Sequence, residues 1–160
     1  MSSNRRKARE LVLRALYSQE MSGNPVDVII EDMILSRKEE ESVTEFAVHL
    51  LKACIEHQTE LDKFIIAKAQ NWDFDRIAIL DKMVMKMAIC EFLHFEDIPP
   101  KVSIDEAIEI AKKYSTEGSG QFINGILDSV LLELRNQDLL KKSGRGLSEQ
   151  GRIVSKKKTN

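Results

Sequence analysis

The stretch Ile77–Leu93, IAILDKMVMKMAICEFL, has the densest apolar pattern in the chain, and the rest of the fold is built around it. Thirteen of its seventeen residues are apolar; the exceptions are Asp81, Lys82, Lys86 and Glu91. A helix that is apolar nearly all round is buried on most sides. We therefore predict that this helix lies at the centre of the fold, packed by several others. Asp81 and the two lysines are expected to mark its narrow exposed edge.

Apolar residues at helical spacing continue on both sides of this stretch. They predict helices over about 4–21, 25–35, 42–70, 103–114 and 121–140, with a break near 57–62 in the longest one. The helix over 103–114 is expected to begin with a capping box, Ser103-Ile104-Asp105-Glu106. No strand pattern or internal repeat is visible in the sequence. It thus predicts the all-α class, with about seven helices in a single globular unit.

The composition of the 160 residues narrows the class of protein. With 42% hydrophobic and 31% charged residues, the chain has enough apolar side chains to fold. It has no run of about 18 apolar residues, so no membrane span is expected. Its two cysteines exclude a disulfide scaffold and a four-cysteine zinc site. Because no apolar signal segment follows the charged N-terminus, we expect cytoplasmic localisation.

The charge is spread unevenly although the formal net charge is only −2. Residues 1–20 hold five basic and two acidic residues, residues 141–160 hold seven and one, and residues 21–140 hold twelve and 23. An acidic body with two basic ends favours a polyanion partner for one end. Residues 141–160 lack apolar periodicity, so we predict a folded domain over 1–140 and a basic tail, disordered from about Gly144.

The N-terminal basic cluster lies on a predicted helix, at the end where the helix dipole disfavours positive charge. Its members are Arg5, Arg6, Lys7 and Arg9. A bound phosphate would be favoured by these side chains and by the free N–H groups of the helix start. Further along the same helix, Leu13 and Tyr17 are expected to project away from the buried stripe. This outward pair fits either a protein contact or packing under another part of the fold.

The sequence shows no pattern that assembles a catalytic or metal site. It has no C-x-x-C, no H-E-x-x-H and no P-loop. His49, His57 and His94 share no metal-ligand spacing. Cys54 and Cys90 fall within apolar helix stripes, as buried inert thiols do. We therefore predict a binding protein, neither an enzyme nor the holder of a cofactor or metal.

Four blocks, in order over about residues 4–140, resemble the NusB transcription antitermination family. The first is Arg5-Arg6-Lys7-Ala8-Arg9-Glu10 with Ala15-Leu16-Tyr17, and the second is Asn71-Trp72, leading through Arg76-Ile77 to Glu91-Phe92. The third is VSIDEAIEIAK over 102–112 with Tyr114 close behind, and the fourth is FINGILD over 122–128. Each block alone is weak, but the four together are specific.

The resemblance implies an all-α fold of two packed helical bundles and a non-catalytic protein. It implies binding of single-stranded boxA RNA from ribosomal RNA operon leaders, a heterodimer with the ribosomal protein NusE, and loading onto the RNA polymerase elongation complex. It also implies phosphate contacts by Arg5, Arg6, Lys7 and Arg9. Tyr17, with Leu13 beside it, matches the family's partner surface, and Asp81 would face the basic NusE.

The fourth block adds Phe122 and Asn124 to the candidate RNA-binding residues. Phe122 fits both stacking of a splayed base and packing in the core. Asn124-Gly125 is expected to serve close helix packing. The chain departs from the family at Gln121, where a lysine is common, so one phosphate contact is expected to be missing.

Two other functions remain open at this point. A protein adaptor would act mainly through NusE, whose basic surface the acidic body should attract. A self-associating helical protein would form a homodimer through the outward patch of the first helix. A NusB-like domain also begins some RNA cytosine methyltransferases, but 160 residues are expected to leave no room for a methyltransferase domain.

Overall fold

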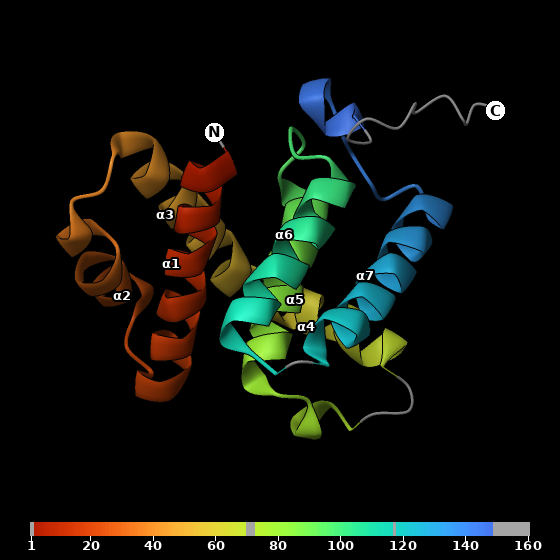
Figure 1. Ribbon diagram of the computed structural model, residues 1–160, viewed down its shortest axis with the longest axis horizontal. Coiled ribbons are helices and arrows are strands. Elements are labelled where there is room, and N and C mark those ends of the chain that lie inside the picture. Colours follow the sequence, from red (N-terminus) through yellow and green to blue (C-terminus); the bar gives the residue numbers. More distant parts are fainter. Residues whose placement is uncertain (1, 70–72, 117, 149–160) are drawn as a thin grey trace.

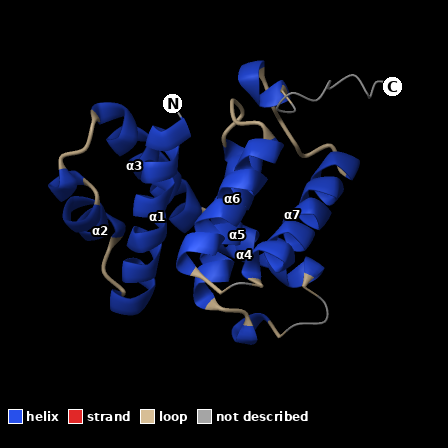
Figure 2. Ribbon diagram, viewed as in Figure 1, coloured by secondary structure: helices blue, strands red, loops and turns tan. Residues whose placement is uncertain are grey.

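The computed structural model describes residues 2–69, 73–116 and 118–148, and these residues form helices joined by loops (Figure 1). The α-helices are α1 (Ser2–Ser22), α2 (Val26–Met33), α3 (Glu41–Glu56), α4 (Gln58–Lys68), α5 (Ile79–His94), α6 (Pro100–Tyr114) and α7 (Ser119–Asn136). Three short 3-10 helices are η1 (Leu35–Arg37), η2 (Phe74–Arg76) and η3 (Gly144–Leu147). Within the described ranges there is no strand (Figure 2). The predicted all-α class and the seven helices are confirmed.

The helices form two groups that share α5 (Figure 1). In the first group, α1 packs against α3 and α2. In the second group, α5 and α7 both pack against α4, and α6 lies between α5 and α7. The helix α5 also contacts α1 and α3, and ten of its sixteen residues are buried. Its predicted central place is therefore confirmed. The break in the long 42–70 pattern is confirmed too, because α3 ends at Glu56 and α4 begins at Gln58.

The predicted exposed edge of α5 is wrong at Asp81, which is only 6% exposed. Asp81 lies in the first turn of α5, where the turn between α6 and α7 covers it. The prediction for Leu13 on α1 is wrong for a related reason. Leu13 is 1% exposed, whereas Tyr17 one turn later is 43% exposed. Since α1 lies between its own group and α5, apolar side chains on two of its faces are buried.

The helix α6 begins at Pro100, one turn before the predicted capping box. Proline suits the first turn of a helix because its missing N–H group would have no partner there. Ser103 therefore lies inside the helix, and its Oγ donates a hydrogen bond to Glu91 Oε1 at 2.6 Å. The S-x-x-E pattern here supplies contacts to neighbouring helices instead of a cap.

The segment after α7 folds back onto the C-terminal end of α5. Lys142 Nζ donates hydrogen bonds to the carbonyl oxygens of Glu91 and Phe95, at 2.9 and 2.7 Å. The Ser143 N–H donates to the Glu96 carbonyl at 3.0 Å. The last carbonyls of a helix lack partners, and a lysine can satisfy them. The structure thus differs from the predicted disordered tail over residues 144–148.

Some predictions concern residues outside the described ranges, namely Asn71-Trp72 and the tail beyond residue 148.

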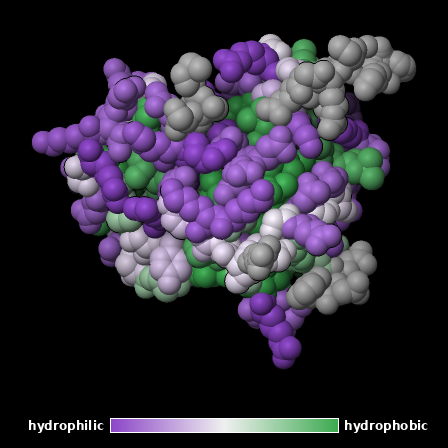
Figure 3. All heavy atoms as spheres, viewed as in Figure 1, coloured by the Kyte–Doolittle hydropathy of each residue, from purple (hydrophilic) through white to green (hydrophobic). Residues whose placement is uncertain are grey.

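On the face shown in Figure 3, hydrophilic residues predominate, and hydrophobic ones show between them alongside α7. Among the helices that the structure describes, none is both long and apolar enough to cross a membrane.

Candidate nucleic-acid interface

The basic turn at the start of α1 is held by contacts with three other segments. The Arg5 guanidinium lies 4.0 Å from the centroid of the Phe46 ring on α3, and partial burial lowers the pKa of Arg5. Arg6 forms a two-point ion pair with Glu106 of α6, with Nη2 to Oε2 at 3.0 Å. Lys7 is exposed, with its Nζ 3.4 Å from Glu39 Oε1. These three cations keep part of their surface open to solvent.

Arg9 is different, because it is only 4% exposed. Its Nε and Nη2 donate to the two carboxylate oxygens of Glu91 on α5, at 2.7 and 3.1 Å. Burial works to lower the pKa of Arg9, but the charge and hydrogen bonds of Glu91 outweigh it and raise that pKa. Arg9 was predicted to contact a phosphate, but its side chain is buried and already paired with Glu91. Arg9 therefore links α1 to α5.

A second set of polar contacts joins α1 to the end of α6. Tyr114 Oη donates to Glu10 Oε1 at 2.8 Å, and Lys113 Nζ donates to the same oxygen at 2.9 Å. Burial works to raise the pKa of Glu10, but the hydrogen bonds from Lys113 and Tyr114 lower it below its usual value. Arg14 donates to Tyr114 Oη at 3.2 Å. Glu10 and Arg14 thus continue the polar contacts of the basic turn along α1 to the end of α6.

The predicted partner surface on α1 is a groove and not an outward pair. The groove has a volume of about 530 Å³ and lies where α1, α2, α5 and α6 meet. Its lining is mainly apolar and consists of Leu13, Arg14, Tyr17, Ser18, Met33, Arg37, Ile79, Leu80 and Tyr114. Buried Leu13 forms part of its floor, and exposed Tyr17 stands at its edge. Such a surface can take the apolar side chains of a partner.

A smaller hollow of about 300 Å³ lies where α7 begins. Phe122 lines it while packing partly against the core, and its role in stacking a base stays a prediction. Asp81 lies beneath and accepts hydrogen bonds from Ser115 Oγ at 2.6 Å and Ser119 Oγ at 2.9 Å. Asp81 therefore ties the turn between α6 and α7 to α5. The prediction that it faces outward toward a basic partner is corrected by this burial.

The residues after Phe122 leave room on the outside of α7. Asn124 is half-buried, and Gly125 is exposed, with no atom within 4 Å of a Cβ added there. The expected close helix packing at Gly125 is therefore wrong. Phe122 and Gly125 are three residues apart and so lie on one face of α7.

The acidic partners of the basic turn, Glu91 and Glu106, were not predicted from the sequence. A signal for Glu91 was present: a carboxylate inside a nearly all-apolar helix needs a buried cation as partner. Which cation it finds depends on the packing of α1 on α5. For Glu106 the capping-box pattern over residues 103–106 instead predicted a role in capping the start of a helix.

Known proteins resemble this chain over most of its length. The model of the NusB family matches residues 6–132. The transcription antitermination protein NusB of Salinibacter ruber is 44% identical over 146 residues, which cover 91% of each chain. That of Chloroherpeton thalassium is 42% identical over 152 residues, covering 92% of this chain and 70% of the relative.

Solved structures show the same fold. T. maritima NusB is 35% identical with a TM-score of 0.75, covering 81% of this chain and 91% of that one. A chain in the crystal structure of antitermination factors NusB and NusE in complex with dsRNA has a TM-score of 0.73 at 20% identity, covering 83% and 99%. The latter likeness concerns the fold alone. The chain described above belongs to the NusB family of transcription antitermination proteins, which are not enzymes.

Proposed function

We propose that the chain binds boxA RNA of ribosomal RNA operon leaders as a heterodimer with NusE and stabilises the antiterminating RNA polymerase elongation complex. The observation that carries the proposal is the basic turn of α1, where Arg5, Arg6 and Lys7 stand on a helix start in an otherwise acidic body. The family membership supports it, as does the fold shared with a structure that contains NusB, NusE and dsRNA.

The RNA contacts divide into phosphate and base contacts. Arg5, Arg6 and Lys7 supply positive charge for phosphates, and Arg9 positions their helix through Glu91. Phe122 offers the exposed part of its ring for stacking, a contact worth about 1–3 kcal/mol in such sites. Asn124, half-buried two residues further along α7, is the second candidate for a contact in this region. The missing lysine at Gln121 weakens this second region.

The two regions lie at different ends of the molecule. In Figure 1 the chain start of α1 lies at the top and α7 begins at the bottom, with α6 running between these levels. Arg6 contacts Glu106 midway along α6, so the part of α6 that separates the two regions, from residue 106 to 114, spans roughly 12 Å at 1.5 Å per residue. One short RNA strand can therefore contact both regions.

The groove of α1 supplies the surface for NusE. Its apolar lining around Leu13 and Tyr17 can bury side chains of a partner helix or loop. The excess of acidic residues over 21–140 attracts a basic protein. The RNA-binding turn and this groove lie on successive turns of α1, so the two partners can bind side by side.

The test is fluorescence anisotropy of labelled boxA RNA against a scrambled RNA of equal composition, with and without NusE, at several salt concentrations. We expect tighter binding to boxA that NusE improves. Arg6→Ala and Lys7→Ala should each reduce the salt slope by about 0.7, the value for one single-strand phosphate contact. Lys63→Ala, on the exposed face of α4, is the matched control.

The adaptor function has its own support in the apolar groove and the acidic body. Tyr17→Ala separates the two functions: it should weaken NusE binding and leave the binding of RNA by the chain alone unchanged. If Arg6→Ala and Lys7→Ala weaken only NusE binding, the adaptor function replaces RNA binding. Self-association through the same groove would appear as a dimer in sedimentation that Tyr17→Ala dissociates.

A further inference from the structure

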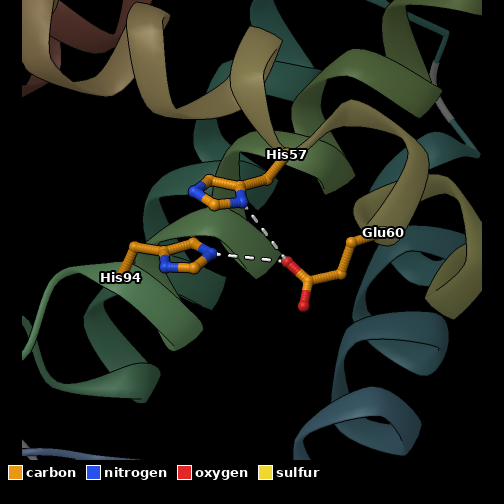
Figure 4. Close-up of side chains that lie close together, drawn as sticks. All are labelled: His57, Glu60 and His94. Carbon is orange, nitrogen blue, oxygen red and sulfur yellow. Dashed lines mark hydrogen bonds and ion pairs between the residues drawn. The ribbon is translucent and has the colours of Figure 1, made fainter.

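Three potential metal ligands, His57, Glu60 and His94, lie together where α3, α4 and α5 meet (Figure 4). His57 is the single residue between α3 and α4, Glu60 is in the first turn of α4, and His94 is the last residue of α5. The sequence shows no ligand spacing here, because His57 and His94 come from distant segments of the chain. The proposed RNA and protein contacts use none of the three.

The donor atoms of these residues converge. His57 Nδ1 and His94 Nε2 lie 3.8 and 3.4 Å from the same oxygen, Oε1 of Glu60. One donor atom from each residue lies within 4.8 Å of the other two. In a tetrahedral zinc site with bonds of about 2.0–2.2 Å, donor atoms are roughly 3.4 Å apart. The two distances to Glu60 are therefore already close to those of a coordination sphere.

We propose that His57, Glu60 and His94 bind a divalent transition-metal ion, with Zn²⁺ as the best fit. Two imidazoles and one carboxylate form a ligand set typical of zinc and poorly suited to Mg²⁺ or Ca²⁺, which prefer all-oxygen ligands. Three protein ligands leave one position of the tetrahedron for water. The three side chains are between 29% and 49% exposed, so an ion can enter from solvent.

Two of the three helix ends at this place favour a cation. The last residues of α3 and α5 lie next to the cluster, and the C-terminal end of a helix carries partial negative charge, whereas the start of α4 carries partial positive charge. The two imidazole rings are stacked, with centroids 3.9 Å apart and planes at 15°. Because the final torsion of a histidine side chain is broad, the rings can turn from stacking to converge on one ion.

The expected consequence is a link between the two groups of helices. His57 follows α3 of the first group, while Glu60 and His94 belong to α4 and α5 of the second. An ion bound by all three stabilises the folded chain, because the unfolded chain does not bring these ligands together. Zinc should therefore raise the melting temperature, whereas Mg²⁺ at the same concentration should not.

The test uses the full chain without an affinity tag, titrated with Zn²⁺ by calorimetry and with Co²⁺ by visible absorption. We expect one ion per chain and a tetrahedral cobalt spectrum without the thiolate charge-transfer band that binding to Cys54 or Cys90 would give. His57→Gln and His94→Gln should each weaken binding at least about tenfold, since even indirect ligand partners contribute 10–100-fold. His49→Gln is the matched control, since His49 is exposed on α3, packs against the Phe95 ring and is not one of the three clustered residues.

Two results would overturn the proposal. One is the absence of stoichiometric zinc or cobalt binding by the wild-type chain. The other is binding that His57→Gln and His94→Gln leave unchanged, which would place the ion elsewhere. If a variant fails to fold, anomalous scattering at the zinc edge from crystals of the wild-type chain decides the matter. Density between the three side chains supports the site, and its absence there refutes it.

Discussion

Arg9 of α1 and Glu91 of α5 form a buried two-point ion pair, with distances of 2.7 and 3.1 Å between their nitrogen and oxygen atoms. Ser103 of α6 adds a hydrogen bond to the same carboxylate. One cluster of polar groups thus joins the first helix to the two helices at the centre of the second group. It also explains why Arg9, an arginine in the basic turn, points inward.

The first prediction concerns the stability that this pair provides. Arg9→Ala leaves the Glu91 carboxylate buried without its partner, so we expect a loss of about 3–5 kcal/mol in the free energy of unfolding. The double variant Arg9→Met/Glu91→Met should recover part of that loss, because no unpaired charge stays buried. Urea unfolding followed by circular dichroism measures both. A loss below 1 kcal/mol for Arg9→Ala would contradict the structural role.

The second prediction concerns Glu106, which pairs with Arg6 and would compete for it with the phosphate of the proposed RNA contact. Removing its charge in Glu106→Gln should tighten RNA binding, because Arg6 can then bind phosphate without first breaking an ion pair with Glu106. Arg6 is 37% and Glu106 12% exposed, and since exposed ion pairs are worth about 0.2–1 kcal/mol, we expect a gain of about fivefold. Anisotropy at low salt measures it, with Glu56→Gln on α3 as control. Weaker binding by Glu106→Gln would mean that the ion pair positions Arg6 for RNA.

The third prediction concerns the exposed glycine of α7. Gly125→Ala should raise the free energy of unfolding by up to about 1 kcal/mol, since alanine favours a helix and no atom lies within 4 Å of the added Cβ. If RNA approaches the backbone beside Phe122, the same variant binds boxA RNA more weakly while being more stable. Thermal unfolding and anisotropy on one sample separate the two effects. A destabilised variant would contradict the open space at Gly125.

The fourth prediction concerns the segment after α7. A Cβ at Gly146 would overlap the carbonyl oxygen of Glu96, so Gly146→Ala should detach residues 142–148 from the end of α5. Trypsin should then cleave after Lys142 and Arg145 faster than in the wild-type chain. Gly118→Ala, where the added Cβ meets no atom within 4 Å, is the control. Equal cleavage rates in all three proteins would show that the segment is not held by this contact.

The fifth prediction concerns pH. Burial lowers the pKa of Lys142 to about 8, against the opposing charges of Glu91, Asp97 and Glu96. Above pH 8 the folded chain releases this proton, while the unfolded chain keeps it up to about pH 10.4. The unfolded state then binds more protons, so stability rises with pH across this window. Relative to Lys142→Met, the wild-type chain should gain stability between pH 8 and about 10. A relative loss over that range would contradict the lowered pKa.

Much of the fold was predictable from local pattern. The 3.6-residue period marked each helix, and the nearly all-apolar stretch 77–93 identified the central one, because burial on all sides demands apolar residues on all sides. The break between α3 and α4 was also visible in the apolar pattern over residues 42–70. The start of α6 was misplaced because Pro100 and a capping-box pattern both signal a helix start, and local sequence does not rank them.

The errors at single residues have a common cause. Leu13 and Asp81 were placed outside because a helical wheel shows one buried face, and it does not show a second helix or turn covering the other. Gly125 was placed in a packed interface that the structure does not form. The RNA and partner residues inferred from the resemblance stay predictions, and burial separates Arg9 from Arg5, Arg6 and Lys7 within them.

The sequence by itself determined the helices, their buried stripes and the family, because these depend on residue type and spacing along one segment. Only the tertiary structure decided the partners of the polar side chains. Arg9 meets Glu91, Ser119 meets Asp81, and His57 meets His94 across helices distant in the chain. Such pairs depend on which helices pack together and at what register, and that choice is made by the core as a whole, not by any local pattern.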